Sequence, residues 1–368
     1  MSAVPDTQDL LPASLARLAA GTHATRAETA AIVEGVLAGT IDLDGCGRWL
    51  VALADLGEGP AEIAGVADAL RARMRPVAHT LPLVADTCGT GGDGSGTFNI
   101  STAAAIVAAA AGLPVAKHGN RAVSSRTGSG DVLEALGVRI DAPPEVAAAA
   151  LRDIGLCFCL APVHHPAMAR VGPLRKSLGR PTVFNLVGPL CNPAGAGVQV
   201  IGVGRPAVRE AMAEAAFALG ASRVLVVSGT IVGAEGKAFD EVSLFGPTDV
   251  IDVSAAGTRR FRWRPEDFGV TTRPAADLAA LAVAGPQESA AAIRAVLAGE
   301  PGPRREIVVL NAAAVLWTAG KADTPSSAAG LAAAAVDSGR ATSALDRLAA
   351  ASRAAPEDGL APRSETRS

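Results

Sequence analysis

Short apolar runs alternate with helix-like stretches from residue 81 onward, and this rhythm constrains the fold more than any other feature of the chain. The runs stand at 83–85, 113–116, 138–140, 156–160, 198–203 and 224–227, with looser candidates at 250–253 and 259–263. Helical patterns such as 144–154 and 206–219 separate most of them. Strands that alternate with helices of roughly 10–15 residues are typical of βαβ units. We therefore predict an α/β fold with a mainly parallel central sheet.

The first 80 residues have a different pattern. Leucines at positions 10, 11, 15 and 18 follow helical spacing, and no strand-like alternation appears before residue 75. A helical segment of this size has little core of its own, so we expect it to pack on the rest of the chain. The predicted organisation is a small helical domain (1–80, with part of the Gly- and Pro-rich stretch 164–192), a larger α/β domain (81–353) and a disordered tail (354–368).

Charge and composition argue against two classes of partner. The 33 Lys and Arg residues against 36 Asp and Glu give a net charge of −3, so no overall positive field exists to hold a nucleic-acid backbone. Aromatic residues make up only 3% of the chain, which leaves few platforms for stacking bases. No apolar run reaches the roughly 18 residues of a membrane helix, and the first residues lack the pattern of a signal peptide. We expect a cytoplasmic protein that binds neither nucleic acid nor membrane.

The cysteines and adjacent histidines do not form a recognisable metal or disulfide pattern. Five scattered cysteines are an odd number without C-x-x-C spacing, which indicates a reducing compartment. Cys157 and Cys159 alternate within an apolar run, so we predict that both are small core residues on one face of a strand. His164 and His165 have no third His or Cys nearby, so a zinc site is not expected.

A glycine-rich segment between a predicted strand and a helix is the first candidate site. Its glycines (89, 91, 92, 94 and 96) let backbone N–H groups approach an anion at the start of the helix. The spacing matches a dinucleotide fingerprint, but the required acidic residue about 20 positions later is missing, and so is the G-K-[ST] of a P-loop. We predict another kind of phosphate site, with Asn99, Ser101 and Thr102 at the helix start. Ser101 either caps that helix, which is favoured when it is considered alone, or binds Mg²⁺ beside a phosphate.

The sequence KHGNR, which follows the next strand, is the second candidate. Parallel strands bind ligands at their carboxyl ends, so this loop should adjoin the glycine-rich one. Lys117 is one of only four lysines and directly follows an apolar strand. It is either an exposed loop residue or a buried cation that needs an anion. Ser124, Ser125 and Ser129 add hydroxyl and N–H groups suited to a phosphate.

Asp240, Glu241 and Arg175, farther along the chain, are the remaining candidate site residues. Asp240 and Glu241 are either a solvated dipeptide or, beside two phosphate loops, ligands for Mg²⁺. Arg175 either clamps a carboxylate or lies on a helix surface. No Ser-His-Asp or Cys-His arrangement is indicated, and no catalytic base is evident. This favours chemistry driven by stabilisation of a leaving group.

Five motifs in order resemble the anthranilate phosphoribosyltransferase family, within the wider nucleoside phosphorylase and phosphoribosyltransferase group. They are DTCGTGGDGSGTFNIST, KHGNRAVSSRTGSGDVLEALG, HHPAM, RKSLGRPTVFNLVGPLCNP and FDEVS. The resemblance implies a small helical domain joined to an α/β domain, and a homodimer formed through the helical domain. It also implies transfer of the phosphoribosyl group from phosphoribosyl diphosphate (PRPP) to the amine of anthranilate, giving N-(5-phosphoribosyl)anthranilate and diphosphate, in tryptophan biosynthesis.

The same resemblance assigns residues to ligands by motif position. PRPP is assigned to Gly89, Gly92, Asp93, Thr97, Asn99, Ile100, Ser101, Thr102, Lys117, Asn120, Ser125 and Ser129. Mg²⁺, as two ions, is assigned to Ser101, Asp240 and Glu241, and anthranilate to Gly89, His118, Asn120, His165 and Arg175. The chain departs from the family pattern at Ala238-Phe239, Arg126 and Gly130. A relative with another acceptor, a nucleoside phosphorylase and a non-enzymatic nucleic-acid-binding relative remain alternatives.

Overall fold

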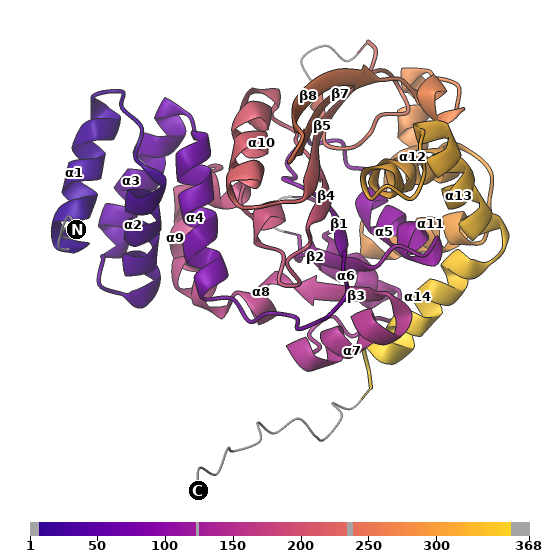
Figure 1. Cartoon of the computed structure of the whole chain (residues 1–368), viewed down its shortest axis with the longest axis horizontal. Coiled ribbons are helices and arrows are strands. Elements are labelled where there is room, and N and C mark those ends of the chain that lie inside the picture. Colours follow the sequence, from indigo (N-terminus) through magenta and orange to yellow (C-terminus); the bar gives the residue numbers. More distant parts are fainter. Residues whose placement is uncertain (1–6, 123–124, 234–237, 355–368) are drawn as a thin grey trace, which may run out of the picture.

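The computed structural model describes residues 7–122, 125–233 and 238–354. Its first four helices, α1 (Thr7–Ala19), α2 (Arg26–Ala38), α3 (Leu43–Leu56) and α4 (Pro60–Ala72), form a bundle to one side of the molecule (Figure 1). Thr25 and Glu28 form a capping box that begins α2, and this helix ends at Gly39 in the left-handed conformation. Within the described ranges, no helix combines the length and apolarity needed to cross a membrane.

The described residues form one eight-stranded sheet in the order β3-β2-β1-β4-β5-β7-β8, with the short β6 paired to β5. The strands are β1 (Ala85–Gly89), β2 (Val115–Gly119), β3 (Leu156–Leu160), β4 (Val198–Gly202), β5 (Arg223–Thr230), β6 (Ala238–Phe239), β7 (Thr248–Ser254) and β8 (Gly257–Trp263). The first five run parallel, whereas β6, β7 and β8 pair in antiparallel fashion. The predicted α/β class with a mainly parallel sheet is confirmed.

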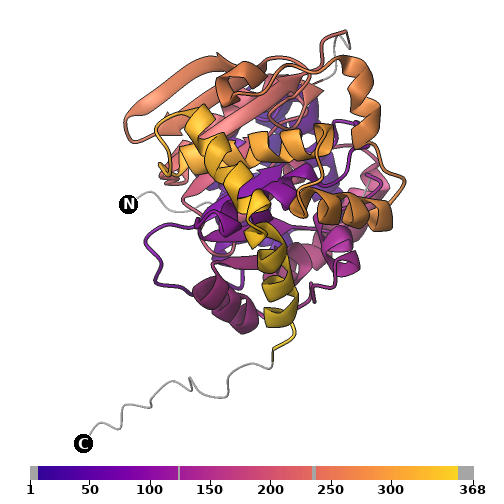
Figure 2. The same cartoon turned by 90° about the vertical axis from the view of Figure 1, so that its right-hand side faces the viewer.

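Helices cover both faces of this sheet. They are α5 (Ile100–Ala110), α6 (Ser129–Ala135), α7 (Pro144–Ile154), α10 (Arg209–Ala218), α11 (Pro286–Leu297), α12 (Pro303–Thr318), α13 (Pro325–Asp337) and α14 (Arg340–Ala351). The gold and yellow C-terminal helices lie on the side away from the helical bundle (Figure 2). Alternate residues of β4 point to opposite cores: Val200 packs with α5 and α12, and Ile201 packs with α10 and the bundle. Burial on both faces explains why these strands are continuous apolar runs.

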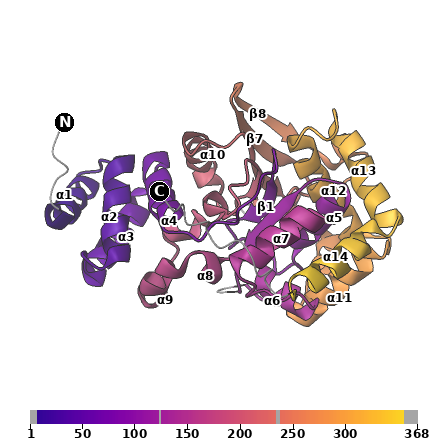
Figure 3. The same ribbon diagram turned by 60° about the horizontal axis from the view of Figure 1, so that its bottom comes forward.

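The irregular stretch 164–192 packs against the helical bundle. It contains 3₁₀ turns and the helix α9 (Gly172–Leu178), and it begins at the end of α8 (Ala161–His164). Val171 and Val183 share a core with Trp49 of α3. Leu174 comes so close to Gly47 that a Cβ there would lie 3.1 Å from its methyl group. This contact joins α9 to the bundle, which stands apart from the sheet in Figure 3. The domain boundaries given above stay a prediction.

One predicted strand is wrong. Residues 138–140 form no strand, although Val138 and Ile140 are buried. The Val138 N–H donates to the Leu133 carbonyl at the end of α6, and the Arg139 N–H donates to Ser352 Oγ. Both N–H groups are therefore used outside the sheet, and the two apolar side chains fill the core from a turn. A short apolar run cannot distinguish these two arrangements.

Two predicted strands extend farther than their apolar runs. β1 continues through Asp86 and Thr87, and β2 continues through Lys117 and His118. The prediction that Lys117 lies in the loop after the strand is therefore wrong. Cys157 and Cys159 are buried on one face of β3 with their sulfur atoms 3.9 Å apart, which confirms them as core residues. Most of the predicted tail, 355–368, lies outside the described residues.

Candidate active site

The glycine-rich loop leaves β1 beside β4 and leads into α5. Gly89 at the end of β1 is in register with Gly202 at the end of β4. Gly91, Gly92, Gly94 and Gly96 have φ values of 68°, 84°, 70° and 68°, which L side chains rarely adopt. The loop is therefore built from the conformation that only glycine tolerates well.

The Asp240 segment lies directly on these two strand ends. A Cβ at Gly202 would be 1.7 Å from the Asp240 carbonyl oxygen, and one at Gly89 would be 2.8 Å from Asp240 Oδ2. The contact at Gly202 is with backbone and requires glycine, whereas the contact at Gly89 is with the end of the Asp240 side chain. The same segment lines a narrow cleft with Thr87, Cys88, Ser101, Val200, Gly202, Val227, Glu241 and Asn311. The structure thus brings the glycine-rich segment and the Asp240-Glu241 pair together.

Two carboxyl groups, those of Asp240 and Glu241, line this cleft, and the charge of Asp93 acts on both. Burial, together with the negative charges of Asp93 and Glu241, raises the pKa of Asp240 well above its usual value. Burial also raises the pKa of Glu241 to about 8. Asp93 Oδ1 accepts hydrogen bonds from Ser95, and a hydrogen bond between the Asp93 and Asp240 side chains adds to the raised pKa of Asp240. The interpretation of Asp240 and Glu241 as a solvated dipeptide is wrong.

These carboxyl groups fit a divalent cation. Mutual repulsion of partly buried carboxylates is relieved when a cation binds between them. The described residues contain no cluster of three or more His, Cys, Asp or Glu that would form a complete metal site by itself. Mg²⁺ does not need one, because it keeps several waters and takes further oxygens from substrate phosphates.

Lys117 is a buried cation, and the alternative of an exposed loop residue is wrong. Its side chain lies in β2 at 4% exposure, and its Nζ donates to the Thr87 carbonyl at 2.6 Å and lies 3.5 Å from Ser101 Oγ. Its charge acts on Glu241 and on the fully buried Asp86. Burial nevertheless raises the pKa of Asp86 to about 6. The ammonium group therefore faces both the start of α5 and the acidic segment.

Ser101 lies inside the first turn of α5, so the interpretation of Ser101 as a helix cap is wrong. The cap position belongs to Asn99, whose side chain does not bond to its own helix. Asn99 instead binds Thr127 and Ser289. The Ser101 N–H donates to Glu241 Oε1 at 3.1 Å, which places a carboxylate at the positive end of the helix.

The other residues that the sequence analysis assigned to PRPP are placed less directly around the start of α5. The Ile100 side chain is 1% exposed and its N–H donates to Phe98, so neither group is free for a ligand, and Thr102 is equally buried. Ser129 Oγ accepts the Asn120 N–H at 3.2 Å, and Ser125 Oγ donates to Thr127. Thr97 forms an isolated antiparallel β-bridge with Ala282. Gly92 and Asp93 lie in the glycine-rich loop. Ser124 lies outside the described residues.

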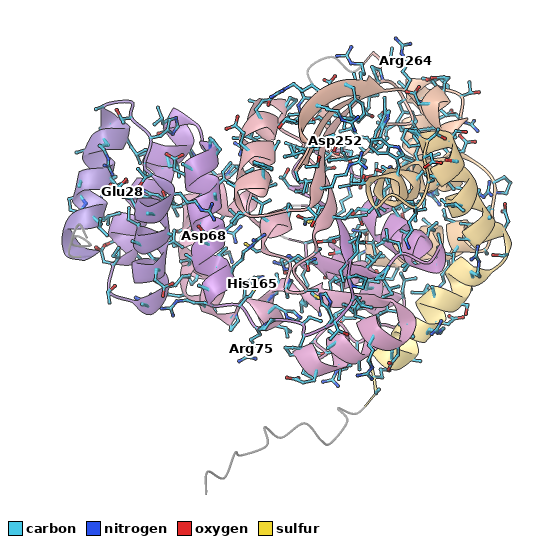
Figure 4. The ribbon with its side chains drawn as sticks, viewed as in Figure 1. Glu28, Asp68, Arg75, His165, Asp252 and Arg264 are labelled. Atoms are coloured by element: carbon cyan, nitrogen blue, oxygen red, sulfur yellow. The ribbon has the colours of Figure 1, made fainter. Side chains whose placement is uncertain are left out.

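The predicted acceptor residues form a second group. The rings of His118 and His165 are 5.2 Å apart. His118 Nδ1 donates to the Gly188 carbonyl and His165 Nε2 donates to the Cys191 carbonyl. Burial lowers the pKa of His118 to about 3 and that of His165 to about 4. Figure 4 labels His165 between the helical bundle and the α/β domain.

Arg175 lies on α9, away from the strands that carry Lys117. Its guanidinium lies 5.7 Å from the centre of the Phe184 ring, and burial lowers its pKa. Among the described residues, none forms a hydrogen bond or ion pair with it. A partly buried guanidinium without an anion is well suited to bind a carboxylate. The structure does not bring Arg175 into contact with Gly89 or Asn120.

Family models and relatives match nearly the whole chain. The α/β domain model of a glycosyl transferase family matches residues 81–342, and its helical bundle domain model matches residues 12–74. Anthranilate phosphoribosyltransferase of Moorella thermoacetica is 43% identical over 341 residues, 93% of this chain and 98% of that protein. The enzyme of Methylobacterium nodulans is 45% identical over 340 residues, 92% of this chain and 98% of that protein. The chain belongs to the anthranilate phosphoribosyltransferase family.

Solved structures of anthranilate phosphoribosyltransferases have the same fold. The crystal structure from Thermus thermophilus matches with a TM-score of 0.84 at 42% identity, over 93% of this chain and 99% of that one. The Saccharomyces cerevisiae enzyme in complex with PRPP and Mg also matches with a TM-score of 0.84, at 27% identity, over 94% of this chain and 98% of that one. The helical bundle and the α/β domain are both included in these matches.

Within this anthranilate phosphoribosyltransferase fold, the structure adds polar residues that the sequence analysis missed. Asp86 is fully buried and accepts hydrogen bonds from the Asn192 side chain and the His118 N–H. Asn311 is buried in α12 and binds the backbone of Val242. The side chains of Asp86, Asn192 and Asn311 are all polar within an apolar surrounding. That contrast could have identified them, since a buried polar group normally has a specific partner.

Proposed function

We propose that the chain transfers the phosphoribosyl group from PRPP to the amine of anthranilate, giving N-(5-phosphoribosyl)anthranilate and diphosphate, as a step of tryptophan biosynthesis. One observation carries this proposal: the Lys117 ammonium, the Ser101 hydroxyl and the Glu241 carboxylate meet at the start of α5, beside the glycine-rich loop. Relatives of this chain carry the same activity in their names, and the yeast neighbour was solved with PRPP and Mg.

The donor would lie with its diphosphate between the glycine-rich loop and Lys117. We assign it to Gly89, Gly92, Asp93, Thr97, Asn99, Ile100, Ser101, Thr102, Lys117, Asn120, Ser125 and Ser129. Burial of Ile100 and Thr102 limits these two to a supporting part in shaping the loop. The lysine charge and the N–H groups at the start of α5 would stabilise the negative charge of the diphosphate as it leaves.

Asp240, Glu241 and Ser101 would hold Mg²⁺, which we propose to be two ions, with Asp93 close enough to contribute charge. Bound Mg²⁺ would neutralise charge on the diphosphate and so make it a better leaving group. In its absence the carboxyl groups repel one another, which adds to the effect of burial on their raised pKa values.

The transfer itself needs one bond to form and one to break. The anthranilate nitrogen gives its lone pair to C1 of the ribose, and the C1–O bond to diphosphate breaks with its electron pair going to the diphosphate oxygen. The nitrogen then releases one proton to water. An aromatic amine is already neutral at pH 7, so no strong base is required. Orientation of the two substrates can lower the barrier by up to roughly 7–11 kcal/mol.

Anthranilate would lie between Arg175, which binds its carboxylate, and the carboxyl end of β2. We assign Gly89, His118, Asn120 and His165 to the same pocket. Because the structure leaves Arg175 apart from Gly89 and Asn120, we propose that the bundle and α9 close over the α/β domain when both substrates bind. Closure would also exclude water, which otherwise hydrolyses the donor.

We further propose a cytoplasmic homodimer formed through the helical bundle. Size-exclusion chromatography with light scattering tests the dimer, since a monomer at micromolar concentration contradicts it. Proteolysis between residues 75 and 85 tests the predicted domain boundary.

A fluorescence assay with anthranilate, PRPP and Mg²⁺ tests the activity. The wild type should consume anthranilate, and the double variant Asp240→Asn with Glu241→Gln should lose Mg²⁺-dependent turnover. The matched control is Glu266→Gln with Asp267→Asn, an exposed vicinal acid pair away from the cleft, which should stay active. A wild type without product overturns the proposed function, and an active Asp240/Glu241 variant removes these two residues from the metal site.

A further inference from the structure

Asn311, in the middle of an apolar helix, contacts the backbone of Val242, the residue that follows Asp240 and Glu241. Asn311 lies in α12 at 4% exposure, and its neighbours from Ile307 to Leu316 are otherwise buried apolar residues. A buried amide costs free energy unless its donors and acceptor are paired. Asn311 therefore needs specific partners to be tolerated in this core.

Those partners are chiefly the two backbone groups of one residue. Asn311 Oδ1 accepts the Val242 N–H at 2.9 Å, and Nδ2 donates to the Val242 carbonyl at 3.1 Å. Nδ2 also donates to the Ile307 carbonyl at 2.9 Å. Val242 is 1% exposed and follows the end of β6, so its backbone has no sheet partner at this point. The Asn311 amide therefore makes the two hydrogen bonds that a neighbouring strand would otherwise make to the Val242 backbone.

Val242 directly follows the acidic pair, which makes this pairing important for the cleft. Glu241 Oε1 accepts the Ser101 N–H at 3.1 Å, so the pair is held by α5 on one side and by the Val242 backbone that follows it. Nearby backbone is fixed from other sides as well: the Ser243 N–H donates to Thr248 Oγ1 at 2.9 Å. Asn311 supplies the contact from α12 and lines the same cleft as both carboxylates.

We propose that Asn311 is a positioning residue for the metal-binding pair, because its amide fixes the Val242 backbone and thereby the direction of the Asp240 and Glu241 carboxylates. The proposal rests on the proposed function for the identity of the metal and the reaction. Residues behind metal ligands commonly change metal affinity by about 10–100-fold when replaced. Asn311 should therefore act on metal dependence rather than on binding of the acceptor.

The test compares Asn311→Leu, which keeps the volume but removes the amide, with Thr318→Val in the same helix. Thr318 is also buried and also donates one hydrogen bond within α12, to Ala314, but it does not contact the acidic segment. Two measurements are made on the full chain: the Mg²⁺ concentration for half-maximal activity, and Mn²⁺ binding with inorganic diphosphate, followed by electron paramagnetic resonance of free Mn²⁺.

We expect Asn311→Leu to raise the half-maximal Mg²⁺ concentration and the Mn²⁺ Kd by about ten-fold or more, with the KM for anthranilate within about two-fold of wild type. Thr318→Val should leave both metal values unchanged. Equal effects of the two substitutions, or no effect of Asn311→Leu, would overturn the proposal, as would a wild type that binds no Mn²⁺. If Asn311→Leu does not fold, Asn311→Ala is judged by the same criteria. The Mn²⁺ titration needs no turnover, so it decides the role of Asn311 even if the transferase activity is absent.

Discussion

The Glu241 carboxylate accepts the backbone N–H of Ser101 at 3.1 Å, although 140 residues separate the two in the chain. This single hydrogen bond joins the acidic segment to the start of α5 and to Lys117, whose ammonium lies 3.5 Å from the Ser101 hydroxyl. A carboxylate and an ammonium thus both lie beside Ser101 in the first turn of α5. The arrangement suits a ligand that carries both negative charge and a divalent cation.

Replacement of Lys117 by Met should reduce kcat by about 10²–10³-fold, because the leaving diphosphate loses a preorganised positive charge in a partly buried site. It should also lower the melting temperature, since Asp86 would stay buried without its neighbouring cation. Steady-state kinetics and thermal unfolding measure the two effects. Lys321→Met, at an exposed lysine, is the control. An active Lys117→Met enzyme would exclude the lysine from catalysis.

Replacement of Arg175 by Ala should raise the KM for anthranilate by about 10–100-fold, the loss expected for a charged hydrogen-bonded pair. The KM for PRPP should change much less. Arg180→Ala is the matched control, because Arg180 is a nearby exposed arginine that pairs with Asp55. Initial rates at varied concentrations of each substrate give both constants. Equal increases for the two substrates would mean that Arg175 does not bind the acceptor.

The buried His118 should make the protein sensitive to acid. Its pKa is lowered to about 3 in the folded chain, mainly by burial and then by His165, against 6.5 when exposed. Between these values the unfolded chain binds a proton that the folded chain does not, so stability falls as the pH decreases through this window. From pH 7 to pH 5, the wild type should lose about 2 kcal/mol of unfolding free energy more than His118→Asn.

Urea unfolding at the two pH values measures this difference. His79→Gln is the control, because the His79 ring also binds a carbonyl, that of Ala194, but lies partly in water. His79→Gln should lose about as much unfolding free energy from pH 7 to pH 5 as the wild type does. Parallel losses in the wild type and His118→Asn would show that His118 does not titrate as described.

Replacement of Gly202 by Ala should displace the acidic segment. The added Cβ would lie 1.7 Å from the Asp240 carbonyl oxygen, so the backbone must move by roughly an ångström or more to restore an ordinary contact. A shift of about 1 Å in a catalytic group can cost about 10²-fold in rate. Gly330→Ala in α13 has open space, and it should keep full activity and gain up to about 1 kcal/mol of stability. Activity of Gly202→Ala near the wild-type value would contradict the described packing.

A feature of the fold or the site could be predicted from the sequence when it depends on residues that are close together along the chain. The strands near 156–160 and 198–203 were predictable because burial on both faces demands a continuous apolar run. The error at 138–140 has the same origin, since an apolar run in a buried turn looks identical. Lys117 was identified as unusual from composition, but its position inside β2 was not, because a charged residue does not extend an apolar pattern.

The sequence by itself determined the α/β class, the helical bundle and the three candidate segments, because hydrophobic periodicity and the need for glycine are properties of neighbouring residues. These segments are the glycine-rich stretch, KHGNR and the pair Asp240-Glu241. Only the tertiary structure decided that Asp240 and Glu241 are shielded by β1, β4 and α12, and that Ser101 meets Glu241 rather than capping its helix. The same holds for Asn311, whose partner lies 69 residues away. These contacts depend on how strands and helices pack, and packing brings together groups whose separation along the chain carries no local signal.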